Sequence, residues 1–196
     1  MRKNFGVKPW FYPLPVLIVG SYDENGQADA MNAAWGGLYD ANLVELCLSS
    51  GHKTTKNIKA TEAFTVSFAD AKNVAKCDYV GIASANKTPD KMEKAGFTVT
   101  KSSFVNAPII EELPMTLECR LKKVTEEGNI IGEIVNISVD DSILDENGQV
   151  KTRRWYDSEG KAYRDVDMTD HGNPKQHPEV PHEHTWDWSS GGPIRK

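Results

Sequence analysis

Short runs of hydrophobic residues, separated by turn-forming residues, recur along the first three quarters of the chain. The run at residues 13–22 predicts a buried strand, and the Asp, Glu, Asn and Gly residues at 23–26 predict a tight hairpin turn after it. In residues 63–68, alternating apolar positions place Phe64 and two further hydrophobic side chains on one face of a strand. Further strands are predicted at residues 29–35, 43–48, 117–121 and 130–139. In residues 117–121, apolar positions alternate with charged ones, which predicts a half-buried strand with Glu118 on its outward face.

Short helices are predicted between these strands. The first covers residues 55–60. The second follows Asp70 as its N-cap and has Val74 and Cys77 on its apolar side, and the third follows Thr88 and stops at Gly96. About six strands with short turns and irregularly inserted helices favour a closed or nearly closed antiparallel barrel over a doubly wound sheet. The predicted fold class is therefore mainly β with helical insertions (α+β).

Composition divides the chain into two parts. The chain has 196 residues, of which 39% are hydrophobic and 26% charged, which is typical of a globular domain with an appendage. Residues 151–196 hold four of the five histidines and three of the five tryptophans, but very few aliphatic residues with which to bury a core. We therefore predict a domain at 1–150 and a polar extension rich in His, Trp and Pro at 151–196.

Charge and cysteine usage exclude several classes of protein. A net charge of −5 without a basic run argues against nucleic-acid binding, and no apolar run approaches the ~20 residues that span a bilayer. The start of the chain lacks the apolar core of a signal peptide. Cys47, Cys77 and Cys119 are widely spaced, which predicts reduced, buried thiols in a cytoplasmic protein.

The first candidate for chemistry is the segment at residues 49–55. It places hydroxyl groups, a glycine, an ammonium and an imidazole between a predicted strand and the start of a predicted helix, where a phosphate can be surrounded by donors. The alternative is a solvated connection whose threonine caps the helix. The candidate ligands are Ser49, Ser50, His52, Lys53 and Thr54.

The second candidate is the segment at residues 31–37. Its small residues would let a flat ring approach the backbone, while Asn32 offers a donor and an acceptor and Trp35 can pack against a ring system. The alternative is a barrel strand with a core tryptophan and a Gly-Gly bulge. The candidate residues are Asn32, Ala33, Ala34 and Trp35.

These segments belong to an ordered series of motifs. The series consists of Trp10, Pro13 and Pro15; Asn32-Ala33-Ala34-Trp35; Lys53-Thr54 with Asn57-Ile58; Phe64-Thr65-Val66-Ser67; Ser84 with Asp90-Lys91; Val105-Asn106-Ala107-Pro108; and Leu117-Glu118-Cys119. It resembles the flavin reductase-like family of FMN-binding split-barrel proteins, and the flavoredoxins within it. The resemblance covers roughly residues 8–148.

The resemblance implies an antiparallel split β-barrel that forms a homodimer and binds FMN near the subunit interface. Residues 32–35 would then line the isoalloxazine ring, and the phosphate and ribityl chain would lie against the candidate ligands of residues 49–54. Ser84 and Lys91 would complete the site, His52 would contribute to it, and the Lys91 cation near the ring would stabilise anionic reduced flavin. No residue is assigned as catalytic.

The implied activity is that of an FMN-binding oxidoreductase, a flavin reductase-like enzyme. Because no G-x-G-x-x-G motif follows a strand, an NADH or NADPH donor would stack on the same flavin. The alternative is a flavin-binding electron-transfer protein that serves a redox protein partner without turnover of its own. A third interpretation is that the barrel is an interaction scaffold without flavin and that the His- and Trp-rich extension binds the ligand or partner.

The extension itself departs from the family, whose members continue past the turn at 145–148 into an aromatic segment that returns toward the flavin. Here His171, His177, His182 and His184 stand in a Pro-rich context instead. These four could together bind a divalent metal ion, with His182 and His184 on the same side of an extended strand, but the spacing fits no standard zinc signature and no metal ligand is assigned. The simpler expectation is a polar extension that docks through its tryptophans or stays mobile.

Overall fold

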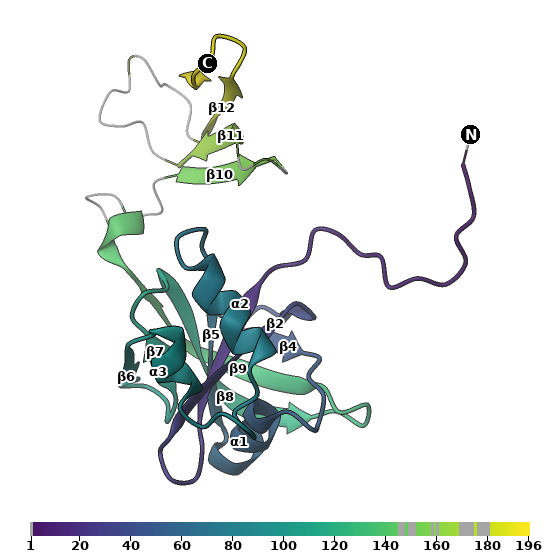
Figure 1. Cartoon of the computed structure of the whole chain (residues 1–196), viewed down its shortest axis with the longest axis vertical. Coiled ribbons are helices and arrows are strands. Elements are labelled where there is room, and N and C mark those ends of the chain that lie inside the picture. Colours follow the sequence, from purple (N-terminus) through teal and green to yellow (C-terminus); the bar gives the residue numbers. More distant parts are fainter. Residues whose placement is uncertain are drawn as a thin grey trace. The chain divides into compact units, whose positions relative to one another are not determined.

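The computed structural model describes residues 2–144, 148, 152–157, 159, 161–168, 175 and 181–196. The chain forms two compact units, Met1–Ser138 and Val139–Lys196, so the division falls before the composition break near residue 150. The purple-to-teal unit and the green-to-yellow unit are distinguished in Figure 1. Within the described residues, no helix combines the length and apolarity needed to cross a membrane.

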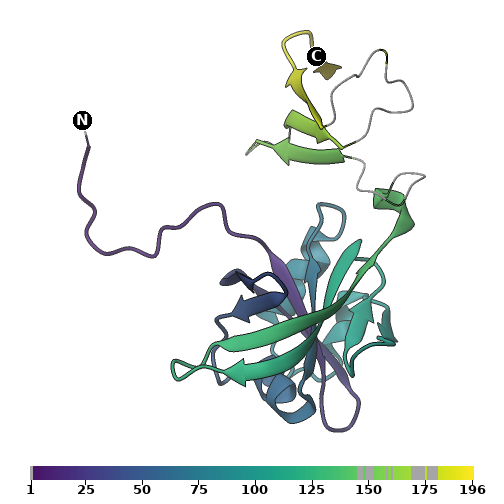
Figure 2. The same ribbon diagram turned by 180° about the vertical axis from the view of Figure 1, so that it is seen from behind.

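A seven-stranded sheet with the order β2-β1-β5-β8-β9-β4-β3 forms the first unit. Its strands are β1 (Leu17–Tyr22), β2 (Ala28–Ala33), β3 (Gly36–Asp40), β4 (Leu43–Leu46), β5 (Ala63–Phe68), β8 (Met115–Val124) and β9 (Ile130–Val139). The sheet curls into an antiparallel half-barrel, seen from both sides in Figures 1 and 2. This arrangement confirms the predicted mainly β, split-barrel fold class.

The first hairpin follows from its turn residues. Gly26 has a φ of +78°, which glycine adopts without a steric penalty. Asp23 accepts hydrogen bonds at 2.9 Å from the backbone N–H groups of Asn25 and Gln27, so the turn is closed by its own side chain. The hairpin pairs β2 with β1 in an antiparallel register that runs from Leu17 and Ala33 to Tyr22 and Ala28.

Three helices and a small sheet complete the first unit. They are α1 (Lys53–Thr61), α2 (Val74–Ile82), α3 (Lys91–Ala95), β6 (Val99–Lys101) and β7 (Pro108–Ile110). One apolar cluster around Phe64 lies on the inner face of the half-barrel. A second cluster, around Ile18 and Cys77, packs α2 and α3 against β1 and β2. The α2 and α3 layer thereby covers the outer face of β2, which is where the candidate site forms.

Several side chains lie differently from the expectation. Val74 is 62% exposed, because α2 begins at this residue and turns Cys77 rather than Val74 toward the core. Cys47 is exposed, since β4 ends before it. Glu118 is 1% exposed although strand alternation predicted an outward position: Ser102 Oγ donates to it, and Asn136 Nδ2 donates to Oε1 at 2.7 Å.

The second unit contains a four-stranded sheet with the order β10-β11-β12-β13. Its strands are β10 (Thr152–Tyr156), β11 (Ala162–Asp167), β12 (His182–Asp187) and β13 (Ile194–Arg195), preceded by the short 3₁₀ helix η1 (Asp141–Ile143). Asp165 and Asp167 are fully buried in it and are paired with arginines. Among the described residues of this unit Ala162 is the one buried hydrophobic residue, so buried ion pairs stand where aliphatic residues are few. The predicted turn at 145–148 lies largely outside the described residues.

Candidate functional site

The start of α1 forms one wall of the candidate site. His52 is its N-cap, with φ −66° and ψ 142°, and within the described chain no side chain caps this helix end. No acidic residue lies in the first turn of α1, so no side chain of the helix itself offsets the partial positive charge of its N-terminus. Thr55 Oγ1 donates to the Ser49 carbonyl at 2.9 Å and thereby fixes the loop that leads into the helix.

Lys53 carries the positive charge at this helix end. Its Nζ donates to Asn57 Oδ1 at 2.8 Å and lies 3.4 Å from Asp23 Oδ2 in the β1–β2 turn. The backbone hydrogen bond from Gln27, with the nearby Lys53 ammonium as a smaller cause, lowers the pKa of Asp23. Asp23 therefore holds the ammonium beside the helix start while leaving the lysine side chain 30% exposed.

Asp29 on β2 is the floor of the site, and sequence analysis did not identify it. Its Oδ2 accepts a hydrogen bond from Thr54 Oγ1 at 2.6 Å, and its Oδ1 lies 2.9 Å from Lys91 Nζ. The same ammonium donates to the carbonyls of Val80 at 3.3 Å and Ala83 at 3.1 Å. The signal in the sequence was a lone acidic residue between two alanines, in a strand whose one other polar residue is Asn32.

These groups surround a pocket of about 220 Å³. Five predicted site residues from three separate segments line it, namely His52, Lys53, Thr54, Ser84 and Lys91. The remaining lining residues are Asp29, Met31, Val80, Gly81, Ile82, Ala83 and Ala85. Asn86 Nδ2 donates to the Gly51 carbonyl at 3.3 Å, which links the loop after α2 to the loop before α1 across the pocket.

The candidate residues of the second segment, at 31–37, do not all lie at this pocket. Asn32 lies at the end of β2 under Gly81, where a Cβ on the glycine would be 2.7 Å from the asparagine Cβ. Ala33 is buried in the barrel core and Ala34 is half-buried. Trp35 is 56% exposed and lines a different pocket of about 440 Å³ together with Trp10 and other residues, so it is not a core tryptophan.

Two residues of the first candidate segment also lie outside the 220 Å³ pocket. Ser49 and Ser50 are exposed and do not line it.

Comparison with known proteins identifies the fold and its class of ligand. The model of the flavin reductase-like domain matches residues 11–159, most of the chain. The chain belongs to the flavin reductase-like family. The matched range extends past residue 148, where the predicted resemblance stopped, and includes part of the second unit. The family has an FMN-binding fold, as the motif series implied.

Individual relatives agree with the family. The flavoredoxin of Desulfovibrio vulgaris (Miyazaki F) is 29% identical, with a TM-score of 0.75 over 89% of this chain and 100% of that chain. The 2-nitrobenzoate 2-nitroreductase of Pseudomonas fluorescens is 25% identical, with a TM-score of 0.63 over 71% of this chain and 72% of that chain. An uncharacterized protein of Aquifex aeolicus is 35% identical over 105 residues, which span 52% of this chain and about half (53%) of that protein.

Proposed function

We propose that this protein is an FMN-dependent oxidoreductase whose flavin lies in the pocket between α1, β2 and the end of α2. The observation that carries this proposal is the uncapped N-terminus of α1, which opens at a pocket lined by four residues of the family motifs, Lys53, Thr54, Ser84 and Lys91, together with His52. The FMN phosphate is an anion, and an uncapped helix N-terminus beside an ammonium is suited to an anion.

The donors at the helix start fit a phosphate in a specific way. The hydroxyl hydrogen of Thr54 already bonds to Asp29, so the donors that remain at this end are the backbone N–H groups of the first helical turn and the Lys53 ammonium. Asp23 is the competitor of the phosphate for that ammonium. Binding of the phosphate would then move Lys53 away from Asp23 toward the pocket.

Bound FMN would supply the redox chemistry, which is consistent with a site built for binding rather than around an acid–base pair. Lys91 has a different role from the one expected of it, because its charge is matched by Asp29. We propose that Lys91 is a positioning residue: it holds the Ala83 carbonyl and so sets the loop that carries Ser84. The electron donor in this proposal is NADH or NADPH, which would meet the flavin at the same open pocket.

A homodimer is part of the proposal. The hollow of the half-barrel is an apolar pocket of about 510 Å³ lined by residues of β3, β4, β5, β8 and β9. Leu38 and Ile137 on its rim are 75% and 46% exposed, and a second copy of the chain would remove both from water. Light scattering of the wild type and of Leu38→Asp tests this, since the charged variant should shift a dimer toward monomer.

The flavin site is tested by titrating the purified chain with FMN and following the flavin absorbance. Each charge-assisted hydrogen bond is worth about 1.5–3 kcal/mol, so Lys53→Ala should weaken FMN binding by roughly 10- to 100-fold. Lys56→Ala is the matched control, because this lysine lies one position beyond the first turn of the same helix and is exposed. A wild-type protein that takes up no FMN would refute the proposal.

The similarity to a flavoredoxin favours one second candidate, a flavin-binding electron carrier that serves a protein partner. Steady-state oxidation of NADH and NADPH, with FMN or FAD as acceptor, separates the two functions. Turnover above the flavin-only background supports the oxidoreductase. Tight FMN binding with no turnover by either nucleotide supports the carrier.

A further inference from the structure

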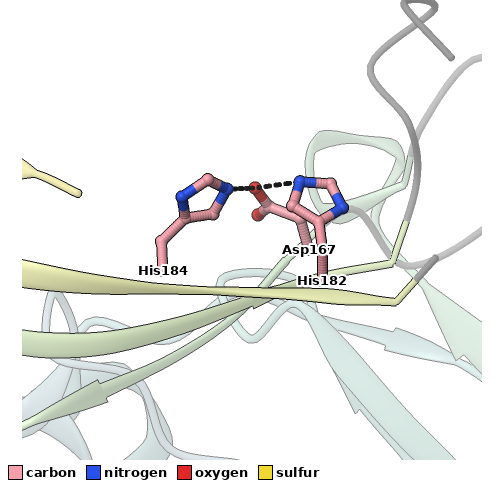
Figure 3. Close-up of side chains that lie close together, drawn as sticks. All are labelled: Asp167, His182 and His184. Carbon is pink, nitrogen blue, oxygen red and sulfur yellow. Dashed lines mark ion pairs between the residues drawn. The ribbon is translucent and has the colours of Figure 1, made fainter. Parts of the chain in front are cut away.

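His182, His184 and Asp167 converge in the second unit, far from the flavin pocket in sequence. On neighbouring antiparallel strands, β11 and β12, Asp167 pairs with His182 and Asp165 pairs with His184. Figure 3 shows the two imidazoles on either side of the Asp167 carboxylate, each with one ring nitrogen directed at it. The Nε2 atoms of His182 and His184 lie 3.6 and 3.4 Å from Asp167 Oδ2.

The orientation of His184 assigns its ring hydrogen. Nδ1 lies 3.1 Å from the Lys196 carbonyl oxygen, and because a carbonyl only accepts, Nδ1 carries the hydrogen in this contact. In the neutral form of the ring, Nε2 then presents its lone pair to a carboxylate oxygen. In that form two acceptors face each other and repel, and a metal cation between them turns the contact into an attraction. A histidine held by a carbonyl at one nitrogen is also the common arrangement of a metal ligand.

We propose that Asp167, His182 and His184 bind a divalent transition-metal ion of the zinc class. With metal–ligand bonds of about 2.0–2.1 Å, tetrahedral ligand atoms lie about 3.4 Å apart, which matches the 3.4 and 3.6 Å separations here. One ligand atom from each residue lies within 4.8 Å of the others. Two imidazoles and a carboxylate leave a fourth position for water or a small anion.

Arg195 is the cation that competes with this ion. Its guanidinium contacts Asp167, and its Nε lies 3.1 Å from Asp165 Oδ2. Asp165 has a second partner in Arg154, which donates to it at 2.7 and 3.0 Å. Arg195 comes from the two-residue strand β13 and its side chain is 34% exposed, so it can keep Asp165 and yield Asp167 to a metal ion.

The experiment is a calorimetric titration of the full chain with Zn²⁺, repeated with Co²⁺, whose visible absorption reports its ligands. We expect about one ion per chain, with affinity reduced at least tenfold in His182→Gln and His184→Gln. Glu183→Gln is the matched control, because Glu183 lies between the two histidines but pairs with Arg164 at 2.8 Å. This readout does not depend on FMN and is independent of the proposed function.

Arg195→Gln keeps the test decisive if the histidine variants unfold. Removing the competing guanidinium should raise the metal affinity severalfold, and loss of structure cannot produce that gain. No Zn²⁺ binding by the wild type, or unchanged or weaker binding by an Arg195→Gln chain whose circular dichroism matches that of the wild type, would overturn the proposal. So would retention of binding in His182→Gln together with its loss in His171→Gln or His177→Gln, two positions outside the described residues.

Discussion

The ammonium of Lys91 lies 2.9 Å from the carboxylate of Asp29, and each side chain is only 3% exposed. The pair joins the start of α3 to β2, and through the carbonyls of Val80 and Ala83 it also holds the end of α2. Burying two charges is costly, and the arrangement is favourable only while both partners and their hydrogen bonds are present. The pocket wall therefore depends on a charge pair.

Removing one member of this pair should be strongly destabilising. We expect Lys91→Met and Asp29→Asn each to lower the free energy of unfolding by about 3–5 kcal/mol, because each leaves a buried polar group without its partner. The double variant should lose less than the sum of the two. Urea denaturation measures these values. In contrast, Lys94→Ala, which removes an exposed pair with Asp90, should leave the urea midpoint almost unchanged, because water screens exposed charges.

The close approach of α2 to β2 makes a second prediction. A methyl group on Gly81 would lie 2.7 Å from the Cβ of Asn32, so Gly81→Ala must push the helix away from the strand. Such overpacking costs about 1–3 kcal/mol, and it should also weaken FMN binding because Gly81 lines the pocket. Gly37→Ala is the control, since its added methyl meets no atom within 4 Å. Equal FMN affinities in both variants would contradict the proposed location of the flavin.

Local patterns predicted most strands of the barrel but not its polar contacts. Strands β5 and β9 and the hairpin turn at Gly26 follow from alternation and turn chemistry alone. The burial of Glu118 depends on Ser102 and Asn136, which are distant in sequence, so the period-two pattern misplaced it. Strand alternation predicts which face of the sheet a residue occupies. It does not predict whether hydrogen-bond donors from distant parts of the chain will allow a charged side chain to be buried there.

The candidate site shows the same limit. His52, Lys53 and Thr54 could be predicted because they are adjacent in sequence at a helix start, and they line the pocket. Asp29 could not, because its significance comes from Lys91, which only the packing of α3 brings near. In the second unit, the pairing of Arg154 with Asp165 replaced the aliphatic core that composition showed to be missing.

The cysteines should differ sharply in reactivity. Cys47 is exposed, whereas burial raises the pKa of Cys119 to about 12 and also raises the pKa of Cys77. Because the thiolate is the reactive form, a disulfide reagent at pH 8 should modify one thiol quickly and two only after unfolding. Cys47→Ser should abolish the fast phase. A fast phase that persists in this variant would show that the core opens near one of the buried thiols.

Acid should destabilise the second unit through Asp165. Burial raises the pKa of this carboxyl, but the hydrogen bonds and charges of Arg154 and Arg195 outweigh burial and hold it below its ordinary value. A carboxyl whose folded pKa lies below its unfolded value of about 3.9 adds stability above that pH, and this stability is lost as the pH falls through the folded pKa.

The expected result is a loss of structure in the second unit below about pH 4. Trp186 is a suitable reporter, because the Arg154 guanidinium lies 4.9 Å from the centre of its ring. Trp186 fluorescence, obtained as the difference from Trp186→Phe, should change along an acid titration of the wild type. Asp165→Asn should already show the altered signal at neutral pH and respond little to acid. Glu183→Gln, which breaks only an exposed pair, should follow the wild-type titration; if it too showed the altered signal at neutral pH and responded little to acid, the effect would be one of general surface charge instead.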